Sequence, residues 1–139
     1  MRILIIRSGS GWGGYVGRYL INTINKVVVD IYKAFDIIKA DVYYDEKVFK
    51  LPLDSFPESS IKEFNYDISD LEGSLPTAEI ETEEVYMYQQ TDEVYFLAED
   101  STIRCILDTS GNGHNVYLKD DQLFQSLSKL LEVVSNDRF

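Results

Sequence analysis

Apolar side chains are concentrated in the first forty residues, where they form two different patterns. Residues 3–6 are four consecutive aliphatic residues, a short run that predicts a β-strand. Beyond a glycine-rich stretch, apolar residues recur every three or four positions, at Val16, Leu20, Ile24, Val27, Ile31, Phe35 and Ile38. This spacing predicts one continuous amphipathic helix. A helix followed by a strand is the alternative for residues 15–40.

The patterns between residues 41 and 76 are shorter. Residues 41–51 alternate around a polar turn at 45–47 and predict a hairpin that Pro52 ends. The sequence Ser55-Phe-Pro57-Glu58 has the form of a capping box with proline at the first helical position, which predicts a short helix over 57–64. Residues 65–76 show little periodicity, and their acidic residues lack the spacing of a calcium-binding loop. We expect a solvated loop there.

Residues 77–118 have the pattern of a β-meander. Ala78, Ile80 and Thr82 alternate with glutamates, which predicts an antiparallel strand buried on one face. The alternation slips at residues 83–84, as a β-bulge would cause. The outer face would then carry Glu79, Glu81, Glu84, Tyr86 and Tyr88. Further strands are predicted over 93–98, 102–108 and 115–118.

The last element predicted is a C-terminal helix. Asp120 is suited to cap it, and Leu123, Leu127, Leu130 and Val134 form one apolar stripe. The predicted fold class is therefore α+β, a single domain over 1–139. A mainly antiparallel sheet of five or six strands would pack against a long N-terminal helix and this C-terminal helix, with residues 3–6 pairing at the sheet edge.

Length and composition agree with one globular domain. The chain has 139 residues, of which 45% are hydrophobic. The apolar run at 3–6 is too short for a signal peptide, and no stretch has the roughly 18 apolar residues of a membrane span. We expect a cytoplasmic protein without membrane attachment. Cys105 is the only cysteine, and its place in a strand-like run indicates a buried, inert thiol.

The net charge says more about the class of partner than the overall composition does. There are 24 acidic and 13 basic residues, with a formal net charge of -11. Such a surface repels phosphate backbones, so we expect no nucleic-acid partner. It would attract a basic protein through long-range electrostatics, although acidity that serves only solubility gives the same composition.

The glycine-rich stretch matches a known motif. Gly9, Gly11 and Gly14 fit G-x-G-x-x-G after an apolar strand, and Asp30 follows at about the distance of a ribose-binding acid. Trp12 would crowd the phosphates, however, and no alternation of further strands and helices follows Asp30. We favour a turn between strand and helix, and keep a nucleotide-binding module as the alternative.

Catalytic and metal-binding signals are weak. His114 is the only histidine and lies in a turn-rich stretch with no assignable nucleophile, and common zinc sites need several His or Cys ligands. We therefore expect no enzyme activity, no metal and no cofactor.

The leading hypothesis for function is inhibition of a basic partner protein. The acidic face of residues 79–88 would pair with the lysines and arginines of the partner, while its tyrosines exclude water. Bacterial immunity proteins act on nuclease toxins in this manner, and a toxin domain is the partner we expect. A regulatory interaction protein that is not an inhibitor is the further alternative.

Overall fold

The computed structural model describes residues 2–9, 17–35, 45–84, 90–98, 100–109 and 114–136. Eight strands form one antiparallel sheet, which is larger than the five or six strands predicted. Their order is β4-β3-β2-β1-β6-β7-β8-β5. The strands are β1 Arg2–Gly9, β2 Gly17–Asn22, β3 Val27–Asp30, β4 Ile61–Glu63, β5 Ile80–Glu83, β6 Gln90–Leu97, β7 Ile103–Asp108 and β8 Asn115–Leu118.

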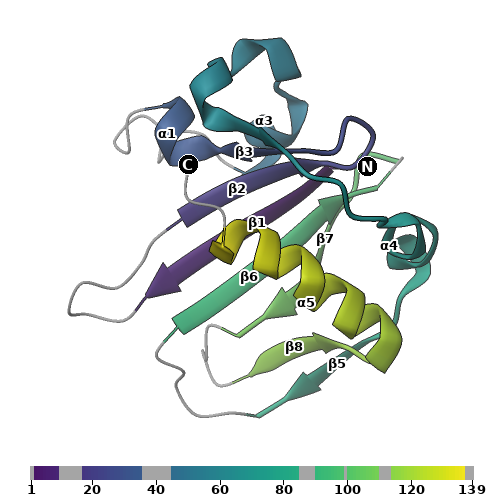
Figure 1. Ribbon diagram of the computed structural model, residues 1–139. Coiled ribbons are helices and arrows are strands. Elements are labelled where there is room, and N and C mark those ends of the chain that lie inside the picture. The colour runs from purple at the N-terminus through teal and green to yellow at the C-terminus, as the bar shows by residue number, and fades with distance from the viewer. Residues whose placement is uncertain are drawn as a thin grey trace.

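The described helices differ greatly in length. One is long, α5 Asp121–Asn136. The others are α1 Ile31–Ala34, α3 Asp45–Lys50 and α4 Ser69–Ser74, with 3-10 helices η1 Leu53–Ser55, η2 Glu58–Ser60 and η3 Leu75–Thr77. Figure 1 shows α5 lying across one face of the sheet, while α1 and α3 lie at the end where β2 and β3 are found.

The prediction that β1 lies at the edge of the sheet is wrong, because β1 lies inside the sheet. Its partners are β2, from Arg2↔Asn22 to Arg7↔Gly17, and β6, from Arg2↔Leu97 to Gly9↔Gln90. With both backbone edges paired, the apolar run at residues 3–6 is free to bury side chains on both faces of the sheet.

Two hydrophobic cores use these two faces. Ile3 and Ile5 are fully buried in a cluster that includes Leu127 and Leu130 of α5. Leu4 points to the opposite face and packs in a second cluster with residues of α1, α3 and the segment that follows α3. The sheet is thus covered by helices on both sides of β1.

The predicted long N-terminal helix is wrong for residues 17–30, which form the β2–β3 hairpin instead. Burial explains the error, because consecutive residues are buried in both strands, residues 19–21 in β2 and residues 27–29 in β3. Strands buried on both faces lose the alternation of apolar and polar residues, and the spacing of the apolar residues here resembled that of a helix. The hairpin turn is fixed by Asn22, whose Oδ1 accepts hydrogen bonds from the amides of Ile24 (3.1 Å) and Asn25 (3.2 Å).

Gly17 has a packing role in β2. A Cβ atom there would lie 2.5 Å from Cε2 of Tyr19, because the buried Tyr19 ring covers this position. Close packing therefore accounts for one glycine of the glycine-rich stretch without any ligand.

Three short segments also differ from the predictions. Residues 45–50 are α3 and not part of a hairpin, because Val48 and Phe49 turn inward to the second core. The predicted helix over 57–64 is a single 3-10 turn, η2, followed by β4, which pairs with β3. The predicted loop contains α4, and Leu71 is fully buried there.

Helix α5 begins where the sequence pattern places it. Asp120 Oδ1 accepts hydrogen bonds from the amides of Gln122 (2.9 Å) and Leu123 (3.2 Å), which satisfies two of the donors at the helix start. The predicted stripe of Leu123, Leu127, Leu130 and Val134 is at most 5% exposed. Beside it, the hydroxyl of Ser126 donates a hydrogen bond to the carboxylate of Asp70 in α4.

Replacing Leu127 by alanine tests the packing of α5. Leu127 is fully buried, so Leu127→Ala should lower the free energy of unfolding by about 2–5 kcal/mol, because it leaves a cavity in the core. Urea unfolding followed by circular dichroism measures the change. Gln125→Ala, at an exposed position of the same helix, is the control and should change stability by less than about 0.5 kcal/mol. Equal effects of the two substitutions would contradict the packing described here.

Candidate partner interface at the acidic sheet edge

Strand β5 forms one edge of the sheet. It pairs with β8 from Ile80↔Leu118 to Glu83↔Asn115, and β8 is its only strand neighbour within the described part of the chain. Figure 1 shows β5 at the border of the sheet farthest from α1 and α3. One row of its backbone N–H and C=O groups therefore faces away from the sheet.

The predicted one-face burial of β5 is wrong. All four strand residues are exposed, and Ile80, expected in the core, has 41% of its surface exposed. The hydrophobic core ends at β8, the neighbour of β5 in the sheet, where Leu118 is buried. An edge strand beyond the covering helix cannot bury either face, although its sequence alternates.

Acidic side chains line this edge. Glu79, Glu81 and Glu84, all predicted as interface residues, are exposed, and so is Glu83, which we did not predict. Glu83 could have been found, because it continues the alternation of Glu79 and Glu81. The predicted residues Tyr86 and Tyr88 lie outside the described residues.

Little positive charge compensates this edge. Lys119 Nζ lies 3.5 Å from Glu79 Oε2, and the two side chains are 61% and 76% exposed. An exposed pair of this kind contributes little free energy and is screened by salt. The carboxylates of residues 79–84, which we call the β5 edge, thus form a negatively charged border of the sheet.

The alternative nucleotide site lacks the expected geometry in its described part. Gly9 ends β1, while Gly11 and Gly14 lie outside the described residues. Residues 17–22 form antiparallel β2, so the described chain after the glycine-rich stretch resumes as a strand and offers no helix start to a phosphate. Asp30 Oδ1 accepts a hydrogen bond from the amide of Lys33 (3.0 Å) and caps α1.

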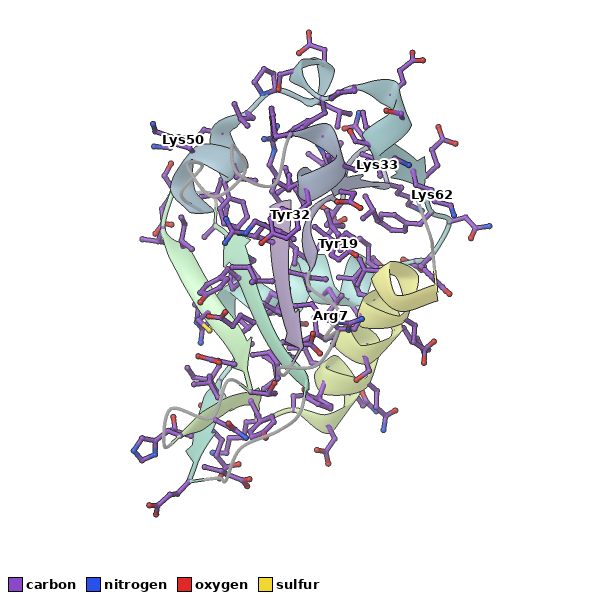
Figure 2. The ribbon with its side chains drawn as sticks, turned by 90° about the vertical axis from the view of Figure 1, so that its left-hand side faces the viewer. Arg7, Tyr19, Tyr32, Lys33, Lys50 and Lys62 are labelled. Carbon is purple, nitrogen blue, oxygen red and sulfur yellow. The ribbon has the colours of Figure 1, made fainter. Side chains whose placement is uncertain are left out.

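A partly buried ion pair joins β1 to β6 near this stretch. Arg7 Nε lies 2.7 Å from Asp92 Oδ1, and the two side chains are 7% and 20% exposed. Figure 2 shows Arg7 and Tyr19 on the side of the sheet that faces α5. Thr109 Oγ1 accepts a hydrogen bond from the Asp92 amide (2.9 Å). Because its carboxylate is already bound to a guanidinium, Asp92 is poorly suited to act as a general base.

The candidate chemical groups of the sequence do not assemble into a site. Cys105 is partly buried, and burial and the nearby Asp108 raise the pKa of its thiol to about 11. His114 is exposed. The described residues contain no group of three or more His, Cys, Asp or Glu side chains placed to hold a metal ion. Of the helices described, none has the length and apolar character needed to cross a membrane.

No protein-family model, curated protein or solved structure matches the chain.

The raised pKa of Cys105 predicts slow alkylation. The ordinary thiol pKa of 9.0 rises to about 11 in the folded protein, so at pH 8 the thiolate fraction should be about a hundredfold smaller than in the unfolded chain. Between these values the unfolded chain loses the proton first, so the contribution of this group to stability is present below pH 9 and falls as the pH rises to about 11.

Iodoacetamide labelling followed by mass spectrometry measures this effect. The rate for the folded protein should increase up to about pH 11, whereas the chain in urea should level off near pH 9. Equal rates in both states at pH 8 would show that burial does not protect the thiol.

Proposed function

We propose that this protein binds a basic partner protein through the β5 edge and thereby inhibits it, as an immunity protein neutralises a toxin such as a nuclease. The observation that carries the proposal is the edge strand β5. It is exposed at all four residues, has no strand neighbour along one backbone edge among the described residues, and is bordered by carboxylates at 79, 81, 83 and 84.

Two physical effects favour a protein partner at this edge. The outward-facing backbone groups of β5 can pair with an extended segment of the partner, which then adds a strand to the sheet. The carboxylates attract lysine and arginine side chains and increase the association rate. They also repel the same edge of a second copy, so the edge favours a basic partner over self-association.

Inhibition would follow from competition for the same side chains. A nuclease binds phosphates with lysine and arginine residues. Carboxylates form charge-assisted hydrogen bonds with these residues, so the bound β5 edge would cover the substrate-binding surface of the partner.

Charge reversal at the β5 edge tests the proposal. The tagged protein is used to capture proteins from a lysate of the cells that produce it, in three forms. These are the unmodified chain, the triple variant Glu79→Lys, Glu81→Lys, Glu84→Lys, and a control variant with Asp54→Lys, Glu58→Lys and Glu132→Lys. All six residues are exposed, and the two variants change the net charge equally.

We expect one basic protein to be retained by the unmodified and control chains and released as salt rises. The edge variant should bind it at least about tenfold more weakly, because attractive pairs become repulsive. Nuclease activity of the captured protein should fall when the unmodified chain is added. Equal retention by both variants would locate the interface elsewhere, and a bound partner with unchanged activity would refute inhibition.

A further inference from the structure

The hydrogen-bond register of β5 determines which of its backbone groups face away from the sheet. The amide of Lys119 donates a hydrogen bond to the carbonyl of Glu79 (2.9 Å), and the next residue, Ile80, lies level with Leu118. In an antiparallel pair, residues that exchange hydrogen bonds alternate with residues that do not. Residues 79, 81 and 83 therefore direct their backbone groups toward β8, while the N–H and C=O groups of Ile80 and Thr82 point outward.

The outward-facing backbone groups are accessible to a partner. Ile80 and Thr82 are both exposed, and β8 is the only strand beside β5 in the part of the chain that the structure describes. Two donors and two acceptors in this arrangement form a template for one further strand.

One face of β5 is acidic. Residues that lie level in neighbouring strands have side chains on the same face. Glu81 and Glu83 therefore share a face with Tyr117 and Asn115 of β8. Neither strand contains a lysine or arginine, and no described residue forms an ion pair with either carboxylate. This face thus lacks a positive charge beside its two glutamates.

The opposite face of β5 is apolar or β-branched. Ile80 lies level with Leu118, and Thr82 lies level with Val116. Leu118 is buried, whereas Ile80 keeps 41% of its surface exposed. Apolar and β-branched side chains on a further strand could cover the exposed part of Ile80.

A strand added beside β5 would continue both faces. Its residues level with Ile80 and Thr82 would exchange backbone hydrogen bonds with them and extend the apolar face. The residues between would point their side chains to the acidic face, because successive side chains of a strand alternate. Opposite charges that face each other across two strands stabilise the pair, and like charges destabilise it. The matching segment is therefore amphipathic and alternates residue by residue.

From this register we propose that the basic partner adds to β5 an extended segment in which lysine or arginine alternates with apolar residues. The apolar residues bond to Ile80 and Thr82, and the basic side chains face Glu81 and Glu83. This inference rests on the proposed function, because it specifies the segment of the partner that the β5 edge binds. It can fail alone, since the carboxylates also attract a basic surface that adds no strand.

Synthetic peptides of identical composition test the proposal. The probe is a capped peptide, Lys-Val-Lys-Val-Lys-Val-Lys, and its control carries the same residues in the order Lys-Lys-Lys-Lys-Val-Val-Val. Titration of the ¹⁵N-labelled protein, followed by NMR, should give a Kd on the order of 0.1 mM for the alternating peptide. The control should bind at least about tenfold more weakly, because only the alternating order places every lysine on the acidic face.

N-methylation distinguishes backbone pairing from attraction of charges alone. Methyl groups on the valine nitrogens remove the donors to the carbonyls of Ile80 and Thr82, so binding should weaken at least about tenfold. Methyl groups on the lysine nitrogens, which face away from β5, are the matched control and should have a smaller effect. At saturation with the unmethylated peptide, the amides of Ile80 and Thr82 should exchange hydrogen at least about tenfold more slowly than in the free protein.

Substitutions in the protein test the acidic face. The double variant Glu81→Gln, Glu83→Gln should bind the alternating peptide at least about fivefold more weakly, because two attractive pairs are lost. The control is Asp54→Asn, Glu58→Gln, which removes the same charge at exposed positions in η1 and η2 and should bind as the unmodified protein does.

Several results would overturn strand addition. These are no saturable binding of the alternating peptide, equal binding of the two peptide orders, equal effects of the two N-methylations, unchanged exchange at Ile80 and Thr82, and equal affinities of the two double variants. If charge reversal at the β5 edge still releases the captured partner, such results leave the inhibitor function intact. If the peptides behave as expected but the captured partner stays bound to the edge variant, the inhibitor function alone fails.

Discussion

The burial of β1 on both faces is the constraint on which this structure depends. Ile3 and Ile5 are buried on one side and Leu4 on the other, so each side of the central strand requires its own apolar cover. Helix α5 supplies one cover, and the short segments α1, α3 and η1 supply the other. Hydrogen bonding to β2 and β6 then satisfies the backbone groups that this burial removes from water. The partly buried ion pair of Arg7 and Asp92 also links β1 to β6 near the end of β1.

The helical cover does not extend over the whole sheet. In Figure 2, no helix among the described residues lies over the lower part of the sheet face turned away from α5. On that face Tyr95 and Cys105 are only partly buried, and at the sheet border β5 is exposed at every residue. Strand β1 is therefore buried on both faces, whereas β5 is exposed and is accompanied by carboxylates at 79, 81, 83 and 84. Among the described strands, β5 combines an outward-facing backbone edge with negative charge, the two properties on which the proposed interface rests.

The difference in burial between the central strands and β5 also explains what the sequence could predict. Helix α5 was predicted because a capping residue and an apolar stripe give it a distinct period. Strands β6, β7 and β8 were predicted because they are rich in β-branched and aromatic residues. Burial on both faces removed the two-residue alternation from β2 and β3, although the three consecutive valines at 27–29 are typical of a strand. The exposure of Glu79 and Glu81 was predicted from alternation. Alternation cannot reveal that a strand lies at an edge, and so the burial of Ile80 was predicted wrongly. The contacts of Arg2 and Arg104 could not be predicted, because each arginine binds a segment that is far from it in the sequence.

The arginines and the carboxylates have different tasks in this acidic chain. A helix as short as α3 or η3 is not stable alone, because forming its first turn costs more entropy than its few hydrogen bonds return. Arg2 and Arg104 donate hydrogen bonds to carbonyls within and just after these segments, at Phe49 and Leu51 in one case and at Leu75, Pro76 and Ala78 in the other. Both arginines belong to strands, so each ties a short helical segment to the rigid sheet. The carboxylates along β5, by contrast, are exposed, and water screens their mutual repulsion.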